Sequence, residues 1–386
     1  MKKIAYVLPS FPVVSETFIT TEIHAMVRRG HEVLPCCFYL EDVPCHPGDE
    51  SILQQMSLIP AVKPIKLLKL LKNIGPGIIE AITFSCLQQG MSFKSLFYSA
   101  LKLAYLAQSN GCRHIHAHFA QGTAATAIVA AKILGVGVSF TGHGHDVYSG
   151  PADLQYKLQY ADISFAVCNR MKKYFEKFNV GKNIKLLYCG VDVSNTSMAK
   201  KTHNKKILYL GRLSEIKGLF ELIHAMTLIP ESLRPELDIA GDGELLDELK
   251  SAVVKYSLQA WVKFLGPVNR SWLKSVSHNY RAIVLPFCRG ADGCYDTGPL
   301  VLKEAMVLDL LVLTSDLIAK GEFIDERSSL VFRESDSKDI AEKIIRAMAL
   351  SEAESNQYTG EAKKRVLQLF SDDASANVMS SYIEAL

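Results

Sequence analysis

The chain has 386 residues, of which 48% are hydrophobic and 22% charged, so it can form two domains with full cores and is not a disordered protein. Its formal net charge is only +3 at pH 7, and the overall charge therefore predicts no nucleic-acid partner. No run of about 18 apolar residues occurs, so the sequence predicts no membrane-spanning helix.

The cysteines also argue against a secreted protein. None of them stands in a C-x2-C pair, and their spacing is not that of a small disulfide-rich domain. We therefore expect free thiols and a cytoplasmic location, where disulfides are rare. The apolar run at residues 4–8 is too short for the core of a signal peptide, and Pro9 ends it.

The chain opens with the pattern strand, helix, strand. Residues 4–8 form the first predicted strand, residues 17–29 have helical periodicity that ends at Gly30, and the next strand starts at Glu32. This order is typical of a doubly wound α/β domain, whose ligands bind beyond the carboxyl ends of the strands.

Three polar residues lie where the loop after the first strand meets the predicted helix: Ser15, Glu16 and Thr17. Because this loop begins at the carboxyl end of the strand, we expect these side chains at the ligand-binding edge of the sheet. The alternative is that they only cap the N-terminus of the helix that follows.

Residues 58–107 are unusually apolar and predict helices. Lysines recur there at every third position: Lys63, Lys66, Lys69 and Lys72. This spacing puts them on one side of a helix, beside a wide apolar stripe, so we expect the helix to lie on an anionic membrane surface. The alternative is a core helix with a solvated face.

Histidines alternate along a later predicted strand, which places His114, His116 and His118 on one face. A second histidine-rich run contains His143 and, three residues later, Asp146. A metal cluster is conceivable there. However, no carboxylate or cysteine completes a recognised metal-ligand spacing, so we predict no metal site.

Residues 194–206 are polar and hold four lysines, and we interpret them as a linker between a domain of residues 1–197 and a domain of residues 198–371. A new strand at residues 207–210 is followed by Arg212, Lys217 and a helix. The forked guanidinium of an arginine and the mobile ammonium of a lysine are both suited to binding phosphate oxygens.

A second loop of this domain connects an apolar predicted strand, residues 282–286, to a predicted helix that begins near Leu300. Pro299 suits the first position of that helix. The start of such a helix attracts anions, and Gly298 lets a phosphate approach the backbone. Asp296 and Glu304, with seven residues between them, are placed to bind hydroxyl groups on either side of that phosphate. The pattern indicates a nucleotide-sugar site.

These segments resemble, in order and spacing, the motifs of retaining glycosyltransferases of family 4, especially the enzymes of bacterial exopolysaccharide and colanic-acid assembly. The motifs are the Ser-Glu-Thr-Phe loop, the Thr-x-His segment, Gly-Arg-Leu, Lys-Gly, Gly-Asp-Gly and E-x7-E. In the last motif the first acid here is Asp296, where the family has Glu.

The resemblance implies the α/β fold called GT-B, in which two Rossmann-like doubly wound domains face a central cleft. The terminal helix, residues 372–386, would cross back to the first domain. The implied catalytic residues are His143, Asp296, Arg212 and Lys217. The implied donor-binding residues are Arg212, Lys217, Gly241, Gly298, Pro299, Leu300 and Glu304. The implied acceptor-side residues are Ser15, Glu16, Thr17, His118 and His143.

The implied reaction transfers a sugar from a nucleotide sugar, a UDP- or GDP-sugar, with retention of configuration and without a metal or other cofactor. The acceptor would be a glycan or lipid-linked saccharide of exopolysaccharide or lipopolysaccharide synthesis, and the protein would lie at the inner face of the cell membrane. Two alternatives remain. One is a catalytically inactive sugar-nucleotide-binding partner, suggested by Asp296, Thr297 and the changed loop after Thr314. The other is an epimerase of the same architecture.

Overall fold

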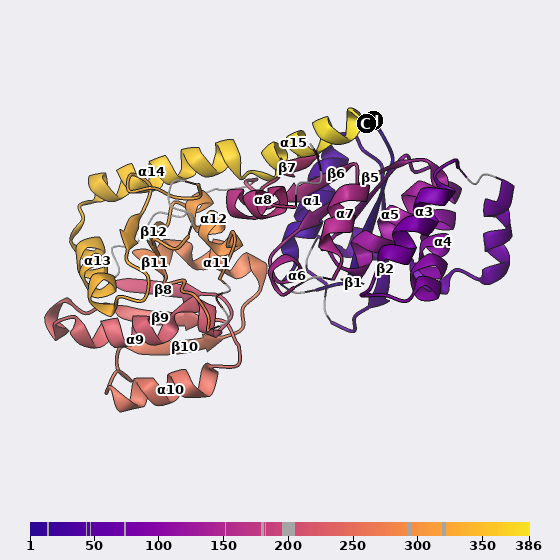
Figure 1. Ribbon diagram of the computed structural model, residues 1–386. Coiled ribbons are helices and arrows are strands. Elements are labelled where there is room, and N and C mark those ends of the chain that lie inside the picture. The colour runs from indigo at the N-terminus through magenta and orange to yellow at the C-terminus, as the bar shows by residue number, and fades with distance from the viewer. Residues whose placement is uncertain are drawn as a thin grey trace. The chain divides into compact units, whose positions relative to one another are not determined.

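The computed structural model describes the chain except for residues 14, 44, 47, 73–74, 151, 179–180, 182, 195–204, 292, 294 and 319–321 and the side chains of Lys69, Leu71, Lys72 and Arg270. The chain divides into two compact units (Figure 1). Unit 1 comprises Met1–Gly190 and Asp372–Leu386, and unit 2 comprises Val191–Ser371.

Unit 1 is built on a parallel sheet with the strand order β3-β2-β1-β4-β5-β6-β7. The strands are β1 (Ile4–Phe11), β2 (Val33–Leu40), β3 (Ser57–Leu58), β4 (His114–His118), β5 (Gly137–Gly142), β6 (Ile163–Ala166) and β7 (Ile184–Leu186). The helices are α1 (Thr17–Arg28), α2 (Glu50–Gln55), η1 (Ile59–Ala61), η2 (Pro64–Lys72), α3 (Ile78–Leu87), α4 (Phe93–Ser109), α5 (Gly122–Leu134), α6 (His145–Tyr148), α7 (Leu154–Tyr160), α8 (Asn169–Glu176) and α15 (Asp372–Glu384).

The central strand β1 is apolar on both faces because helices cover both sides of the sheet. Its alternate residues Ile4, Tyr6 and Leu8 pack in a core with side chains of α1 and α15. On the other side, α5 contacts β1, β4 and β5 and is itself buried almost all round. Helix α5 lacks a polar face because α3 and α4 cover its outer side.

Unit 2 has a second parallel sheet, in the order β10-β9-β8-β11-β12-β13. The strands are β8 (Lys206–Leu210), β9 (Glu236–Ala240), β10 (Val262–Gly266), β11 (Ala282–Leu285), β12 (Leu311–Ser315) and β13 (Leu330–Phe332). The helices are η3 (Glu215–Lys217), α9 (Leu219–Leu228), η4 (Glu231–Leu233), α10 (Leu246–Lys255), α11 (Arg270–Val276), η5 (Ser277–Asn279), α12 (Leu300–Val307), α13 (Ser337–Ala349) and α14 (Glu352–Leu369).

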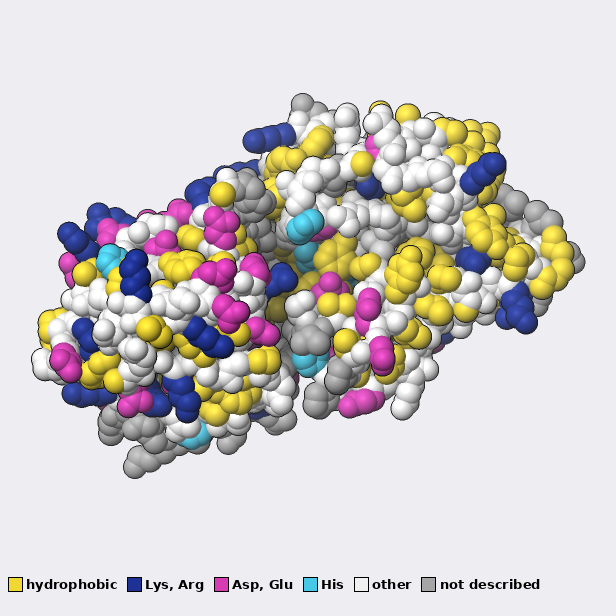
Figure 2. All heavy atoms as spheres, turned by 90° about the horizontal axis from the view of Figure 1, so that it is seen from below, with side chains coloured by type: hydrophobic (Ala, Val, Ile, Leu, Met, Phe, Trp, Pro, Cys, Tyr) yellow, Lys and Arg dark blue, Asp and Glu magenta, His cyan; other side chains and the backbone are white. Residues whose placement is uncertain are grey.

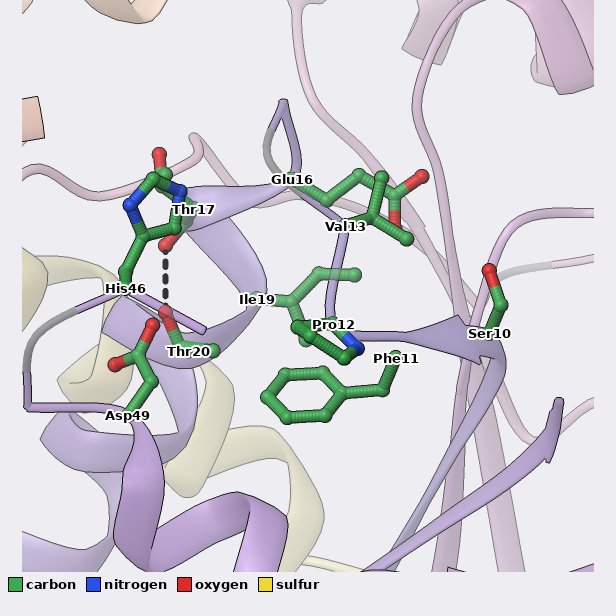
Figure 3. Close-up of a pocket in the computed structure, with 10 residues that line it drawn as sticks. All are labelled: Ser10, Phe11, Pro12, Val13, Glu16, Thr17, Ile19, Thr20, His46 and Asp49. Carbon is green, nitrogen blue, oxygen red and sulfur yellow. Dashed lines mark hydrogen bonds between the residues drawn. The ribbon is translucent and has the colours of Figure 1, made fainter. Parts of the chain in front are cut away.

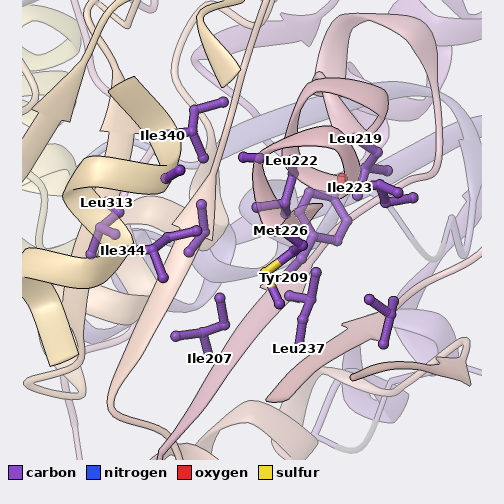
Figure 4. Close-up of a cluster of buried hydrophobic side chains, with 14 of the residues drawn as sticks. Ile207, Tyr209, Leu219, Leu222, Ile223, Met226, Leu237, Leu313, Ile340 and Ile344 are labelled. Carbon is purple, nitrogen blue, oxygen red and sulfur yellow. The ribbon is translucent and has the colours of Figure 1, made fainter. Parts of the chain in front are cut away.

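The core of unit 2 lies between this sheet and the helices α9, α10 and α13. Ile207 and Tyr209 of β8 pack against Leu222 and Met226 of α9, and Ile344 comes from α13 (Figure 4). All five side chains are fully or almost fully buried.

Both sheets reverse their strand order next to the first strand of the unit. In unit 1 the reversal lies between β1 and β4, and in unit 2 between β8 and β11. Loops that leave two such strands at their carboxyl ends diverge to opposite sides and open a crevice, which is where α/β proteins of this type bind ligands. The architecture predicted from the sequence, two Rossmann-like doubly wound domains, is therefore confirmed.

Some boundaries differ from the prediction. The structure divides after Gly190, earlier than residue 197, because Val191 already pairs with Ser371 of unit 2. Most of the predicted linker, residues 195–204, lies outside the described residues. Pro299 is the N-cap of α12 rather than its first helical residue. The lysine-bearing segment includes the 3-10 helix η2, in which residues three apart stack in one row. Lys63 precedes this helix, and the side chains of Lys69 and Lys72 lie outside the described residues.

Candidate functional site

In unit 2, the packing of the loops at the carboxyl ends of the strands depends on two glycines. A Cβ on Gly218 would stand 1.9 Å from the Pro286 carbonyl oxygen, and one on Gly241 would stand 1.9 Å from the Gly211 carbonyl oxygen. Both glycines also have positive φ angles, 63° and 135°. The loops therefore pack backbone against backbone, and this contact fixes the position of the residues beside them. Gly241, predicted to bind the donor, has this structural role.

Two predicted site residues, one from the loop after β8 and one from the loop after β11, form an ion pair. Lys217 Nζ donates to Asp296 Oδ2 over 2.6 Å, and the ammonium also lies 4.8 Å from the centre of the Phe287 ring. The two side chains are 15% and 20% exposed, so they are shielded from bulk water but still reachable by a ligand. A paired cation and carboxylate of this kind can bind a phosphate and a hydroxyl group side by side.

The loop that carries Asp296 ends at the N-terminus of α12. Pro299 caps the helix without a side-chain hydrogen bond, and the Gly298 N–H donates to Asp296 Oδ1 over 3.3 Å. A Cβ on Gly298 would stand 3.3 Å from the Phe323 ring, so the missing side chain also makes room for that ring. Leu300 begins the helix, and Glu304 lies one turn further on, partly buried.

Arg212 is not held in this pair. Its side chain is 76% exposed, and its Nε lies 3.8 Å from Glu244 Oε2. The backbone of Arg212 is fixed, because its carbonyl oxygen accepts a hydrogen bond from the Tyr209 hydroxyl over 2.8 Å. The structure thus brings Lys217 and Asp296 together and leaves the guanidinium of Arg212 exposed.

In unit 1, the carboxyl ends of β4 and β5 bring two predicted site histidines together. His118 Nδ1 lies 3.0 Å from His143 Nε2, and the His143 ring packs against Phe18 and Phe119, whose ring centres lie 4.4 and 4.8 Å away. Burial and the neighbouring His118 lower the pKa of His143 well below its usual value. His143 is therefore a neutral imidazole, which suits a hydrogen bond to a sugar hydroxyl.

Asp146 fixes this arrangement. Its buried carboxylate accepts backbone N–H groups from Ala120 over 2.7 Å, from His143 over 2.9 Å and from Gly144 over 2.8 Å. The loops after β4 and β5 are thereby joined. Burial raises the pKa of Asp146, although the backbone donors oppose this shift. Neither this role of Asp146 nor the position of Cys189, whose Sγ lies 3.9 Å from His143 Nδ1, was predicted from the sequence.

The loop after β1 lines a small recess together with the start of α1 (Figure 3). Glu16, Thr17 and Asp49 are among its polar lining residues, whereas Ser15 is exposed outside it. The alternative that side chains here cap α1 is wrong for Glu16, which occupies the capping position without a side-chain hydrogen bond. Burial raises the pKa of Glu16 to about 7, so its carboxyl group can exchange a proton near neutral pH.

The sequence predicts no metal site because no carboxylate stands at a recognised metal-ligand spacing. In the folded chain, a carboxylate from another element lies beside the histidines. Glu22 of α1 brings a carboxylate to the buried face of β4, where its Oε1 lies 3.3 Å from His118 Nε2 and 3.8 Å from His116 Nε2. All three residues are buried, and no sequence spacing indicates their contact. His114 is turned to Ser139 instead, with 2.7 Å between Nε2 and Oγ.

The surface around η2 is both apolar and basic. Ile65 and Leu68 are 68% and 57% exposed, and Lys63 and Lys66 are exposed beside them. Leu70 is buried, so η2 packs on the protein through this side chain. Figure 2 shows hydrophobic side chains gathered on unit 1 with lysine or arginine side chains among them. No helix in the described part of the chain combines the length and apolarity needed to cross a bilayer.

Two doubly wound parallel units with site residues at each strand-order reversal define a protein of the GT-B architecture. Residues 15–195 match the family model "Glycosyltransferase Family 4", and residues 193–366 match "Glycosyl transferases group 1". The two models together span most of the chain, so it belongs to these glycosyltransferase families.

Several named proteins are similar to this chain. A putative colanic acid biosynthesis glycosyltransferase of Salmonella typhimurium, WcaL, is 23% identical, with both chains covered completely. The amylovoran biosynthesis glycosyltransferase AmsK of Erwinia amylovora is 27% identical over 47% of this chain and 45% of its own. The structure of Anabaena HepE in complex with UDP covers 100% of both chains, with a TM-score of 0.72 and 16% identity. The chain is a glycosyltransferase of the kind found in polysaccharide biosynthesis.

Proposed function

We propose that this glycosyltransferase moves a sugar from a nucleotide-sugar donor, a UDP- or GDP-sugar, to a glycan or lipid-linked saccharide, with retention of configuration. The observation that carries the proposal is the Lys217–Asp296 ion pair at the carboxyl ends of β8 and β11. It supports a site where a diphosphate meets a cation while a carboxylate faces the sugar. Relatives named for colanic acid and amylovoran biosynthesis are consistent with a polysaccharide product.

Charge compensation is the main chemical task of the unit 2 residues. As the bond between sugar and nucleotide breaks, negative charge develops on the departing diphosphate, and positive charge develops on the sugar ring. Lys217 and the N–H groups at the start of α12 are placed to stabilise the first charge, and Asp296 the second. These groups offset the diphosphate charge without a metal ion or other cofactor at the donor, and Arg212 adds a mobile donor when nucleotide binds.

The unit 1 residues are suited to the acceptor and to the sugar hydroxyls. His143 is neutral and held between aromatic rings, so it can donate or accept a hydrogen bond without carrying charge. Glu16, with a pKa of about 7, adds a second group able to bind a hydroxyl. Retention follows if the acceptor attacks the same face of the sugar that the diphosphate leaves, with the acceptor proton passing to a diphosphate oxygen.

The η2 surface supports a location at an anionic membrane, where lipid-linked acceptors are found. Each lysine near such a surface contributes about 1 kcal/mol of binding. We expect sedimentation with anionic vesicles that is reduced by salt and by the double variant Lys63→Gln and Lys66→Gln. The matched control Lys172→Gln and Lys173→Gln, in α8 of the same unit, should sediment like the wild type. Equal sedimentation of all three proteins would contradict this location.

One observation favours the inactive partner, because the ion pair with Lys217 already engages the Asp296 carboxylate. Release of nucleoside diphosphate distinguishes the three functions. A transferase releases it from a UDP- or GDP-sugar only when an acceptor is added, and the anomeric configuration of the product, measured by NMR, tests retention. Product formed from the donor alone would indicate an epimerase. Binding without any product, across a panel of donors and lipid-linked acceptors, would indicate an inactive partner.

A further inference from the structure

Three buried side chains of unit 1 converge on one point below the reversal between β1 and β4. One carboxylate oxygen of Glu22 and one imidazole nitrogen each of His116 and His118 all lie within 4.8 Å of one another. Glu22 Oε1 lies 3.3 Å from His118 Nε2 and 3.8 Å from His116 Nε2. Ligand atoms about 2.1 Å from a tetrahedral ion stand roughly 3.4 Å apart, so a small inward movement would complete the coordination.

We propose that Glu22, His116 and His118 bind a divalent transition-metal ion of the zinc class. Two imidazoles and one carboxylate form a ligand set suited to such ions, whereas Mg²⁺ and Ca²⁺ prefer oxygen ligands. The site lies within unit 1 and does not depend on the proposed transfer reaction, whose diphosphate is assigned to unit 2.

The hydrogen bonds behind the two rings support this assignment. A metal-bound imidazole usually donates its second N–H to an acceptor, which fixes the ring in place. His116 Nδ1 lies 2.8 Å from Ser139 Oγ, and His118 Nδ1 lies 3.0 Å from His143 Nε2. Both rings are therefore held by Nδ1 with Nε2 turned toward Glu22.

The atoms that face the proposed ion lack adequate protein partners. His118 Nε2 is buried and has no hydrogen-bond partner among the described residues, since its 3.3 Å approach to Glu22 is not aligned as a hydrogen bond. Glu22 Oε1 accepts the Tyr6 hydroxyl over 3.1 Å, and His116 Nε2 lies 3.3 Å from Thr141 Oγ1. A buried carboxylate and an unsatisfied buried nitrogen are both costly, and one cation would satisfy both.

The ion would join α1 to β4 under the loops that hold Glu16 and His143. Its expected effect is structural, because Glu22 and His116 are buried below the strand ends. The competing account is an ion pair between Glu22 and a protonated histidine, with no metal. The two accounts differ in metal content and in the response of stability to zinc.

The first experiment uses the full chain without a histidine tag, stripped with EDTA and then exposed to ZnCl₂. We expect one zinc ion per chain after gel filtration, measured by plasma mass spectrometry, and a melting temperature raised by several degrees. CoCl₂ should give the visible absorption of a tetrahedral cobalt site. A wild-type chain that retains no zinc, or that shows neither the shift nor the cobalt bands, would overturn the proposal.

Three variants locate the site. Glu22→Gln keeps the shape of the side chain but removes its charge, and it should weaken zinc binding more than Ser139→Ala, for which loss of an outer partner predicts roughly 10- to 100-fold. The control His114→Gln lies on the same strand face outside the ligand set and should bind zinc like the wild type. If Glu22→Gln retained zinc as tightly as the wild type, the binding would lie elsewhere and the proposal would fail. If this variant did not fold, the cobalt bands of the wild type alone would decide between the two accounts.

Discussion

The residues beside the strand-order reversals of the two sheets differ in charge and in exposure to solvent. In unit 1, His118 and His143 are packed among aromatic rings, and burial keeps His143 neutral. In unit 2, Lys217 and Asp296 keep opposite charges that balance each other at partial exposure. A neutral, rigid site suits hydroxyl groups, whereas a charged and accessible one suits a diphosphate. Similar topology thus supports two binding chemistries, because the residues at the strand ends differ.

The sharpest test of this contrast removes the charge on the unit 2 carboxylate. Asp296→Asn should lower the rate of sugar transfer by about 10²- to 10³-fold, because the developing positive charge on the sugar loses its partner. Nucleoside diphosphate should still bind, since Lys217 is freed from its ion pair. Turnover and nucleotide affinity are measured separately. The control is Asp247→Asn, an exposed acid of α10, and equal activity of both variants would contradict the role of Asp296.

The close backbone contact between Gly218 and Pro286 is the second feature of unit 2 to test. Gly218→Ala should destabilise unit 2 by at least about 3 kcal/mol, since the new methyl group meets the Pro286 carbonyl oxygen at 1.9 Å and the residue has a positive φ. Gly266→Ala is the matched control, because Gly266 also has a positive φ but nothing lies within 4 Å of its added Cβ. That variant should lose only about 1 to 2 kcal/mol. Urea unfolding compares the two, and equal losses would show that the close contact is unimportant.

The exposed Arg212 guanidinium of unit 2 should contribute to ligand binding and not to the stability of the fold. Arg212→Ala should weaken nucleotide-sugar binding or turnover by about 1.5 to 3 kcal/mol, the typical value of a hydrogen bond to a charged group. Its unfolding midpoint should stay unchanged, since the guanidinium is 76% exposed. Arg327→Ala, which removes a guanidinium that is 81% exposed, is the control for general charge loss. Activity within about twofold of the wild type would remove Arg212 from the donor site.

The smallest expected effect concerns Glu16 of unit 1, an acid whose pKa lies near neutrality. Glu16 has a folded pKa of about 7, raised chiefly by burial above its ordinary value of 4.5. The folded state therefore holds this proton while the unfolded state loses it, and the contribution to stability is present below pH 4.5 and lost as the pH rises to 7. Glu16→Gln should flatten the decline in unfolding free energy between pH 5 and pH 7, as urea titrations would show. Parallel profiles for the two proteins would mean that Glu16 titrates normally.

Much of the fold and of the unit 2 site follows from the sequence. Strand and helix periodicity is a local property, and it placed Lys217 after β8 and Asp296 after β11, at the ends of strands that a doubly wound sheet brings side by side. The alternation of His116 and His118 likewise predicted that they share one face of β4. The approximate division of the chain into two α/β domains could also be predicted from the change in composition near residue 194.

Only the tertiary structure decided which side chains meet. Lys217 and Asp296 are 79 residues apart, and their pairing depends on the Gly218–Pro286 contact that brings the two loops together. Glu22 reaches His118 because α1 packs on the face of the sheet where that histidine points. A periodic pattern states which face of an element is buried, but not which other element covers it. For this reason the sequence could suggest the histidines and could not supply their carboxylate.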